Sequence, residues 1–316
     1  MKSFILAAVA SSAMALSEIE SAFLGYITQF GKSYESVAEY EMRLRTFAYK
    51  HSFIEEHNQS GEAYKLGHNK FSDWTDEEYK AILTYKPGMY NIVDTFDEKL
   101  EAATPVDWRT SSCMSPVQDQ GQCGSCWAFS SVSALESNYC IANGTLYKLS
   151  EQQLVDCVKL CFGCNGGNQS LAFNYYKDHY AMSESSYPYT AKDGTCNYSS
   201  SNNTGVKTTG WVAVTSDSPD AMKAALASNP MSVSIQANQL SFQLYTSGIF
   251  TNTNCGTNLD HATNVVGWGT SNGMDYWIMR NSWGTGWGMS GYMELEIVAG
   301  AGLCGIQMGP LYPIAN

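Results

Sequence analysis

Hydrophobic and polar positions recur with a helical period in the first part of the chain. Six positions between residues 39 and 58 follow one another at spacings of three or four residues, which places them along one side of a helix. They are Glu39, Arg43, Phe47, Lys50, Ile54 and Asn58. A second helix is predicted a little further on, because Ser72 and Thr75 are suitable caps for the acidic residues Asp76 and Glu78. Residues 85–101 contain Pro87-Gly88 and no regular pattern, and they predict an extended linker.

A strand-like pattern dominates the last part of the chain. His261 opens an apolar run through Ala262, Val265, Val266 and Trp268, which predicts a buried strand. The following run, DYWIMRNSWGTGWG, predicts a second strand that ends in a glycine-rich turn containing Asn281 and Trp283.

The first fifteen residues have the pattern of a secretory signal peptide. Lys2 precedes an apolar run, and Ala13-Met14-Ala15 fits an A-x-A cleavage site. No later apolar run approaches the length of a membrane span. We therefore expect export, into surroundings where disulfides persist.

Composition divides the chain into two parts. All 10 cysteines lie at or after Cys113, whereas residues 16–103 contain none and carry 16 acidic against 9 basic side chains. The whole chain of 316 residues is 44% hydrophobic, as expected of a globular protein with a well-filled core. Its formal charge of −12 is scattered along the sequence, which argues against a nucleic-acid partner. The acidic, mostly helical front segment is interpreted as a removable module.

The segment QGQCGSCWAFS, residues 120–130, contains a C-x-x-C pair that permits three kinds of chemistry. Cys123 and Cys126 could bind zinc together with Cys161 and Cys164. They could form a redox pair, although the tryptophan here follows the second cysteine, unlike the thioredoxin-like arrangement. Alternatively, one thiol could be a nucleophile, which needs a histidine base.

Only two histidines follow residue 104. His179 lies in a polar, helix-ending stretch and reads as a surface residue, whereas His261 opens the buried strand. His261 is therefore the better candidate for the base.

Three motifs together resemble the papain-like cysteine peptidases. They are QGQCGSCWAFS, LDHATNVVGWG and RNSWGTGWG, with His261 and Asn281 following Cys126 by 135 and 155 residues. The helix pattern of residues 39–58 resembles the family's E-x3-R-x3-F-x2-N-x3-I-x3-N propeptide motif, except that Lys50 replaces the first asparagine. Gly67, Asn69, Phe71 and Asp73 match its G-x-N-x-F-x-D motif, which points to the cathepsin L-like branch.

The resemblance implies an α+β, papain-like two-lobed fold preceded by a helical propeptide. It divides the chain into a signal peptide (1–15), an inhibitory propeptide (16–103) and a peptidase domain (104–316), with cleavage near Ala103. Within that domain it implies a helical lobe over about 113–211 and an antiparallel, barrel-like β lobe over about 212–316. Protonation of propeptide carboxylates, Asp73 among them, is expected to speed maturation as the pH falls.

The same resemblance assigns roles to the residues of the motifs. Cys126, at the first turn of a helix that favours its thiolate, is the expected nucleophile, and His261 is its partner and general acid. Asn281 is expected to orient the His261 ring, and Trp283 to shield that hydrogen bond from water. The Gln120 side chain and the Cys126 N–H are expected to bind the developing oxyanion. Neither a cofactor nor a metal is called for.

Substrate contacts and disulfides are also implied by the resemblance. The expected substrate-binding positions are Gly166, Gly167, Asn168, Gln169, Ser234, Leu259, Asp260, Trp283 and Gly309. Gly309 implies a deep pocket without an acid, one that does not favour arginine, while Asn168 and Gln169 make its wall more polar. The implied disulfides are Cys123–Cys164, Cys157–Cys196 and Cys255–Cys304, and one further bridge is possible among Cys113, Cys140 and Cys161.

The expected function is therefore that of a cysteine endopeptidase made as an autoinhibited zymogen. Its expected partners are peptide and protein substrates and its own propeptide, and it is expected to be a monomer without a membrane span. The expected location is the secretory pathway, ending in a lysosome, an acidic vacuole or the extracellular space. Two alternatives stay open: a thiol-disulfide oxidoreductase using Cys123 and Cys126, and a catalytically silent homologue that binds peptidases.

Overall fold

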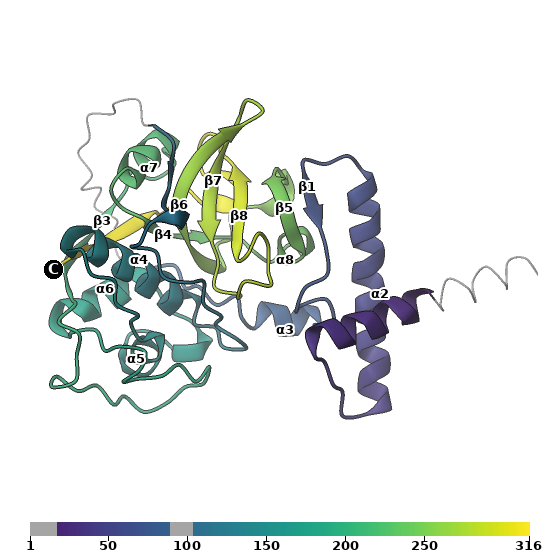
Figure 1. The fold of residues 1–316 in the computed structure, drawn as a ribbon, viewed down its shortest axis with the longest axis horizontal. Helices are drawn as coiled ribbons and strands as arrows, with labels where there is room; N and C mark the ends of the chain where they lie inside the picture. Colours follow the sequence, from purple (N-terminus) through teal and green to yellow (C-terminus); the bar gives the residue numbers. More distant parts are fainter. Residues whose placement is uncertain (1–17, 89–103) are drawn as a thin grey trace, which may run out of the picture.

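The computed structural model describes residues 18–88 and 104–316. The predicted signal peptide, residues 1–15, and most of the predicted linker with its cleavage point at Ala103 lie outside the described residues. Residues 18–30 are helical, and they cross the long helix α2 (Val37–Gln59) at the side of the molecule (Figure 1). The two helices pack through an aromatic cluster around Phe23, Tyr26 and Phe47.

Helix α2 forms where the periodic pattern predicts it. Ser36 caps its first turn by accepting a hydrogen bond from the Glu39 N–H, and Phe47, Lys50 and Ile54 form its buried side. The buried position of Lys50, where the motif has asparagine, is an unusual site for an ammonium group.

Helix α3 (Asp76–Lys80) follows after a short strand. Of the two expected caps, Thr75 is the one at the helix start, in a reciprocal capping box with Glu78. The strand before it, β1 (Tyr64–Leu66), pairs antiparallel with β5 of the main sheet.

The middle of the chain forms a helical lobe. It contains α4 (Cys126–Asn143), α5 (Glu151–Cys157) and α6 (Gln169–Asp178). These helices enclose a core in which Trp127, Leu135, Leu154 and Tyr176 are fully buried. Helix α4 ends at Gly144, whose φ of +75° suits glycine best.

The remainder is built around one sheet. Its strands are β2 (Val106–Asp107), β3 (Thr208–Ala213), β4 (Met231–Ile235), β5 (Tyr245–Phe250), β6 (His261–Ser271), β7 (Met274–Arg280), β8 (Tyr292–Glu296) and β9 (Leu311–Ala315). The order is β1-β5-β8-β7-β6-β4-β9-β3, with β2 beside β6, and the pairings are antiparallel except β5 with β8. Helices α7 (Pro219–Leu226) and α8 (Leu240–Gln243) connect strands, and short 3-10 helices cover Trp108–Thr110, Gly163–Asn165, Thr253–Cys255 and Leu303–Gly305.

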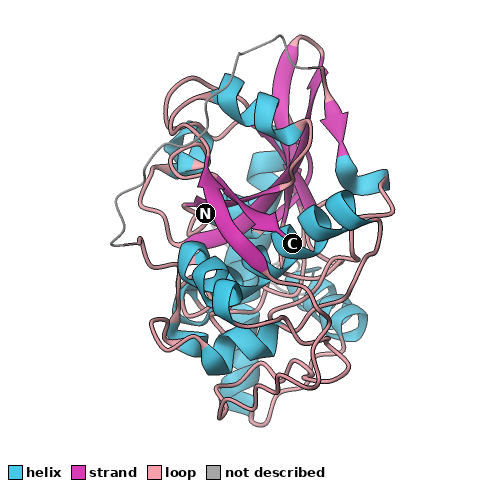
Figure 2. Ribbon diagram, turned by 90° about the vertical axis from the view of Figure 1, so that its left-hand side faces the viewer, coloured by secondary structure: helices cyan, strands magenta, loops and turns pink. Residues whose placement is uncertain are grey.

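Helices and strands are segregated, as expected of an α+β fold. Figure 2 shows the strands gathered in one half of the molecule and α4 to α6 with long loops in the other. Because helix α4 packs against strand β6, the start of α4 and the start of β6 lie at the junction of the two halves.

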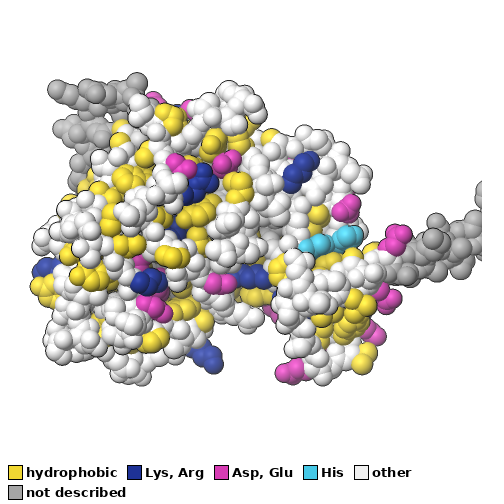
Figure 3. Space-filling view, in the orientation of Figure 1, with side chains coloured by type: hydrophobic (Ala, Val, Ile, Leu, Met, Phe, Trp, Pro, Cys, Tyr) yellow, Lys and Arg dark blue, Asp and Glu magenta, His cyan; other side chains and the backbone are white. Residues whose placement is uncertain are grey.

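The front segment, described over residues 18–88, is part of the same hydrophobic core as the sheet. Phe71, Tyr79 and Ile82 are buried in one cluster with Phe242 and Trp283. On the face in Figure 3, acidic and basic side chains are dispersed without one large charged patch. Within the described residues, no helix combines the length and the apolar character that crossing a membrane requires.

Candidate active site

The two cysteines of the C-x-x-C segment are in different chemical states. Cys123 is bonded to Cys164, whereas Cys126 is a free, fully buried thiol in the first turn of α4. Neither a zinc site built from both pairs nor a Cys123–Cys126 redox pair fits this arrangement. The opening residues of a helix concentrate unpaired N–H groups, which favour a thiolate at Cys126 once water or substrate can reach it.

His261 lies at the first position of β6 with its ring held from two sides. Its Nε2 is 2.9 Å from Oδ1 of Asn281, and the ring of Trp283 stacks on it at 4.7 Å between centroids. The Asn281 oxygen also accepts from the Ser282 N–H at 2.8 Å, which fixes the orientation of the amide. Nδ1 of His261 is buried and has no hydrogen-bond partner among the described residues, so this nitrogen is the one left for a reacting group.

Burial keeps both reacting groups neutral in this form of the chain. It raises the pKa of the Cys126 thiol to about 11, against hydrogen bonds from the backbone of Ala262, Thr84 and Trp127. Burial also lowers the pKa of His261 to about 4, although the hydrogen bond to Asn281 acts in the opposite direction. The expected thiolate–imidazolium pair is therefore disfavoured while the site is covered.

Gln120 presents its side-chain amide to the Cys123 carbonyl, three residues before Cys126. The Ser282 hydroxyl donates to Oε1 at 2.7 Å, which leaves Nε2 to donate to the carbonyls of Cys123 at 3.0 Å and Ile82 at 3.2 Å. Ile82 belongs to the front segment, so the amide already holds a carbonyl oxygen that comes from the segment covering the site.

Residues 82–88 cover the site in extended form. The Thr84 hydroxyl donates to the Gly124 carbonyl at 2.6 Å, the Tyr85 N–H to the Asp260 carbonyl at 2.9 Å, and the Lys86 N–H to the Gly167 carbonyl at 2.9 Å. A Cβ added to Gly166, whose φ is +116°, would lie 2.0 Å from the Thr84 carbonyl oxygen. A glycine is needed there because the covering backbone comes this close.

Most of the remaining predicted substrate positions lie around Tyr85. Asn168, Gln169 and Gly309 line a cavity around its ring, together with Ser170, Trp211, Ala213, Pro310 and Leu311. Ser234 reaches the Tyr85 hydroxyl, whereas Leu259 lies beside Gly305 and is not among the residues that line this cavity.

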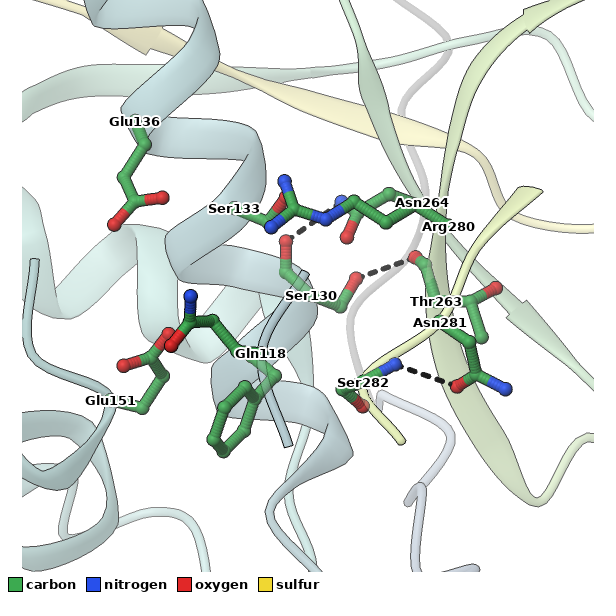
Figure 4. A pocket seen from close by; sticks show the side chains of 11 residues that line it. Gln118, Ser130, Ser133, Glu136, Glu151, Thr263, Asn264, Arg280, Asn281 and Ser282 are labelled. Atoms are coloured by element: carbon green, nitrogen blue, oxygen red, sulfur yellow. Dashed lines mark hydrogen bonds between the residues drawn. The ribbon is translucent and has the colours of Figure 1, made fainter. Parts of the chain in front are cut away.

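A small buried polar cavity lies behind Asn281, between α4 and the sheet (Figure 4). Ser130 Oγ donates to the Thr263 carbonyl at 2.6 Å, and Arg280 donates to Ser133 Oγ at 2.9 Å. Asn264 Nδ2 donates back to the Ser130 carbonyl at 2.9 Å. These bonds tie the helix that carries Cys126 to the strands that carry His261 and Asn281, and so fix their separation.

Four disulfides stiffen the walls of the site. The three implied bridges are present: Cys123–Cys164, Cys157–Cys196 and Cys255–Cys304. The fourth, left open by the sequence, is Cys113–Cys140, and Cys161 is a free buried thiol.

The front segment is anchored on the Trp283 ring, which stacks on His261. The rings of Phe71 and Tyr79 contact Trp283 edge-on at 5.1 and 5.7 Å between centroids. Asn69 Nδ2 donates to the Gln243 carbonyl at 2.8 Å, and the Tyr79 hydroxyl to the Ala237 carbonyl at 2.8 Å. The same Trp283 that covers the His261–Asn281 bond therefore serves as the docking face for the propeptide.

Asp73 is buried in the front segment, where its carboxylate accepts three hydrogen bonds. Its carboxylate accepts from the Tyr26 hydroxyl at 2.7 Å, Lys32 Nζ at 2.8 Å and the Tyr34 hydroxyl at 3.0 Å. Nearby, Arg43 holds the Glu78 carboxylate with two hydrogen bonds, which lowers the pKa of Glu78. Both carboxylates are therefore engaged by donors in the covered form.

Comparison with known proteins agrees with this geometry. A model described as papain family cysteine protease matches residues 102–314, and one described as cathepsin propeptide inhibitor domain (I29) matches residues 23–79. The chain belongs to the papain family of cysteine proteases.

Relatives and solved structures extend the match over almost the whole chain. A probable cysteine protease RD21B of Arabidopsis thaliana is 42% identical over 94% of this chain and 67% of its own length. Digestive cysteine proteinase 1 of Homarus americanus is 41% identical over 90% of this chain and 92% of its own length. Among solved structures, a recombinant stem bromelain precursor aligns with a TM-score of 0.86 at 35% identity, and procathepsin L 3 from Tenebrio molitor with 0.84 at 35%; each alignment covers 94% of this chain and 99% of the other.

These matches confirm the predicted family with its cathepsin L-like branch, the α+β fold and the activity. The chain is a cysteine endopeptidase made as an autoinhibited zymogen, and the comparisons support neither the oxidoreductase nor the silent homologue. Sequence reasoning missed the contacts of Thr84 and Tyr85 with the site, because a linker pattern carries no sign of where the segment docks. It also missed Ser282, whose position directly after Asn281 was the only available signal.

Proposed function

We propose that Cys126 is the nucleophile of this endopeptidase and that His261 is its general acid and base. One observation carries the proposal: Cys126 is a free, buried thiol in the first turn of α4, and α4 packs against β6, the strand that begins at His261, while Asn281 occupies the far nitrogen of the His261 ring. The only ring nitrogen without a partner is then available to Cys126.

The reaction follows from these groups. The Cys126 sulfur attacks the carbonyl carbon of the scissile peptide, and the oxyanion binds to Gln120 Nε2 and the Cys126 N–H. His261 protonates the departing amine, which leaves a thioester. His261 then removes a proton from water, the hydroxide attacks the thioester, and the carboxylic acid is released as Cys126 is restored. Asn281 keeps the ring oriented, and Trp283 shields their hydrogen bond.

The front of the chain is proposed to act as the inhibitor of this site. The contacts of Thr84, Tyr85 and Lys86 support propeptide residues 16–103 lying across the cleft, with Gly166, Gly167 and Asp260 holding the same segment that a substrate would occupy. We assign residues 1–15 to a signal peptide and residues 104–316 to the mature, monomeric peptidase, divided near residue 211 into its two lobes. Four disulfides support passage through the secretory pathway to an acidic vesicle or the extracellular space.

The test compares intact mass with turnover of a fluorogenic Phe-Arg amide after acid incubation. Wild type should lose the propeptide and gain activity, whereas Cys126→Ser should do neither. Cys161→Ser is the matched control, because Cys161 is the other free buried thiol and is expected to mature normally. Activity in Cys126→Ser, or its loss in Cys161→Ser alone, would contradict the assignment.

A further inference from the structure

The pocket around Tyr85 ends in a fixed hydrogen-bond donor. The Asn168 amide cannot reverse, because its Oδ1 accepts from the Ser170 N–H at 2.9 Å and the Ser170 hydroxyl at 2.6 Å. Its Nδ2 therefore faces the cleft, where it donates to the phenol oxygen of Tyr85 at 3.3 Å and to the Lys86 carbonyl at 2.9 Å. With Tyr85 and Lys86 in place only 6% of Asn168 is exposed, so a substrate ring bound in the position of Tyr85 would shut solvent away from this amide in the same way.

The Ser234 hydroxyl is a second hydrogen-bond donor in the same pocket. Gln169 Nε2 donates to Ser234 Oγ and to the Val233 carbonyl, each at 3.1 Å, and this leaves the Ser234 hydrogen free to point into the pocket. Burial raises the pKa of Tyr85, and the hydrogen bonds from Ser234 and Asn168 act against that rise, as donors to a phenol oxygen do. The buried Gln169 side chain thus orients Ser234 toward the hydroxyl of a bound ring.

The size and charge of the pocket suit an uncharged aromatic side chain. A cavity of about 80 Å³ remains beside Tyr85, and a Cβ added to Gly309 would meet no atom within 4 Å. The lining residues within the described chain include no ionised side chain, so nothing there would neutralise an arginine. Apolar groups of Trp211 and Leu311 form the rest of the wall.

Tyr85 also marks which substrate residue the pocket receives. Thr84 lies at the turn before α4, where its hydroxyl donates to the Gly124 carbonyl at 2.6 Å. Tyr85 is the next residue along the cleft and pairs with Gly167. Asn168, Gln169 and Gly309 beside it are among the substrate-binding positions that the family resemblance implies, and the proposed peptidase function assigns this pocket to the second residue before the scissile bond.

We propose that this pocket selects tyrosine at the second position before the scissile bond, through hydrogen bonds from Asn168 and Ser234 to its hydroxyl. The inference rests on the proposed peptidase function. Phenylalanine fits the same space but leaves two largely buried donors without their acceptor. A site that hydrogen-bonds a substrate hydroxyl discriminates against the analogue that lacks it.

The experiment compares two fluorogenic substrates, Tyr-Arg amide and Phe-Arg amide with the same blocking group, on acid-matured enzyme. We expect kcat/KM to favour tyrosine about tenfold in wild type, the value of one well-made hydrogen bond of about 1.4 kcal/mol. The ratio should fall toward one in Ser234→Ala and in Asn168→Ser, where the serine keeps an oxygen that can cap α6 but is too short to reach the ring. Ser228→Ala, an exposed serine at the end of α7, is the matched control and should keep the wild-type ratio.

The outcomes distinguish the tyrosine preference from the proposed peptidase function. Equal kcat/KM for both substrates in wild type, or an unchanged ratio in both pocket variants, would overturn the tyrosine preference while leaving the peptidase assignment intact. A mature wild-type chain that cleaved neither substrate would overturn the proposed function and this inference together.

Discussion

At the scale of single residues, the side chains of the site are already oriented, but Cys126 and His261 are uncharged. Asn281 and Trp283 fix the His261 ring, and Ser282 fixes both the Asn281 and the Gln120 amides. The orientation needed for catalysis is therefore present in the zymogen. What the zymogen lacks is an accessible, charged pair, because the covering segment keeps Cys126 and His261 away from water.

Gln120 offers the sharpest residue-level prediction. In Gln120→Ala, the amide that now binds the Ile82 carbonyl is missing, so the oxyanion loses one of its two donors. We expect kcat to fall about a hundredfold with little change in KM, since the donor acts mainly in the transition state. Steady-state kinetics on the Phe-Arg amide measure the effect.

The control for that measurement is Gln118→Ala. Gln118 is two residues away, and its side chain donates only to the nearby Pro116 carbonyl. Equal kinetics for the two alanine variants would remove Gln120 from the oxyanion site.

Residue patterns indicated candidate reacting groups but not all of their surroundings. The roles of Cys126, His261 and Asn281 stay predictions, and these residues could be singled out because each lies in a compact local motif. Cys113–Cys140 could not be assigned, because three leftover cysteines allow three pairings and only the fold brings two of them together. The role of Lys50 could not be predicted from the sequence either. Its Nζ donates to the Phe71 and Trp74 carbonyls, each at 2.7 Å, and these lie in a turn whose position relative to α2 is set only by the fold.

At the scale of elements, α2 and the turn after β1 form a histidine contact. Nδ1 of His51 lies 2.9 Å from Nε2 of His68, and the two rings are parallel. His68 also stacks on Phe47 and contacts Ser72 Oγ through Nδ1 at 3.0 Å. Burial, together with the charges of His51 and Lys50, lowers the pKa of His68 to about 4.

This contact gives the propeptide a defined response to pH. Because the pKa of His68 is about 4 when folded and 6.5 when free, the unfolded propeptide takes up a proton between these values and the folded one does not. The stability that His68 contributes is present above pH 6.5 and is lost as the pH falls toward 4. The lowered pKa of Glu78 acts in the same direction at still lower pH.

His68→Phe tests this response, because phenylalanine keeps the stack on Phe47 and cannot be protonated. We compare the conversion rate of the full-length variant with that of wild type at each pH. Relative to this ratio at pH 7, we expect the variant to be about three- to tenfold slower at pH 5.5, where the lower figure allows for solvent screening. The assay follows cleavage of each zymogen by a trace of active enzyme. His179→Phe, a ring stacked on Tyr175 in the helical lobe, is the control. An identical pH dependence in all three proteins would eliminate His68 as a contributor.

At the scale of the whole molecule, the propeptide and the peptidase respond to acid in opposite ways. Strand β1 and the rings of Phe71 and Tyr79 complete the sheet and core of the β lobe, so the zymogen is one packed body. Acid weakens the propeptide through His68 and Glu78. In the peptidase, burial raises the pKa of Glu151 to about 7 and of Asp260 to about 6, so acid stabilises that part. These shifts predict that falling pH weakens the propeptide more than the peptidase.

Glu151 carries the prediction for the enzyme half. This carboxyl is buried in the first turn of α5, with Lys148 Nζ at 2.7 Å and Glu136 nearby. Its free pKa is 4.5, so between pH 4.5 and 7 the unfolded chain gives up a proton that the folded chain keeps, and stability falls as the pH rises through this window. In Glu151→Gln the titration is absent. The melting temperature of wild type should fall from pH 5 to pH 7.5. In the variant this fall should be smaller by about 2 to 4 °C for each kcal/mol of pH-dependent stability that Glu151 contributes in wild type.

The measurement uses mature enzyme blocked at Cys126 with iodoacetamide, so that self-digestion does not distort the melting curve. Asp178→Asn, which removes an exposed carboxylate at the end of α6, is the control and should retain the wild-type pH dependence. If Glu151→Gln lost as many degrees as wild type between the two pH values, the acid preference of the peptidase would have to come from other groups. Asp260 would then be the next to replace, because its raised pKa lies in the same window and its carboxylate accepts from the Ala237 N–H at 2.7 Å beside the cleft.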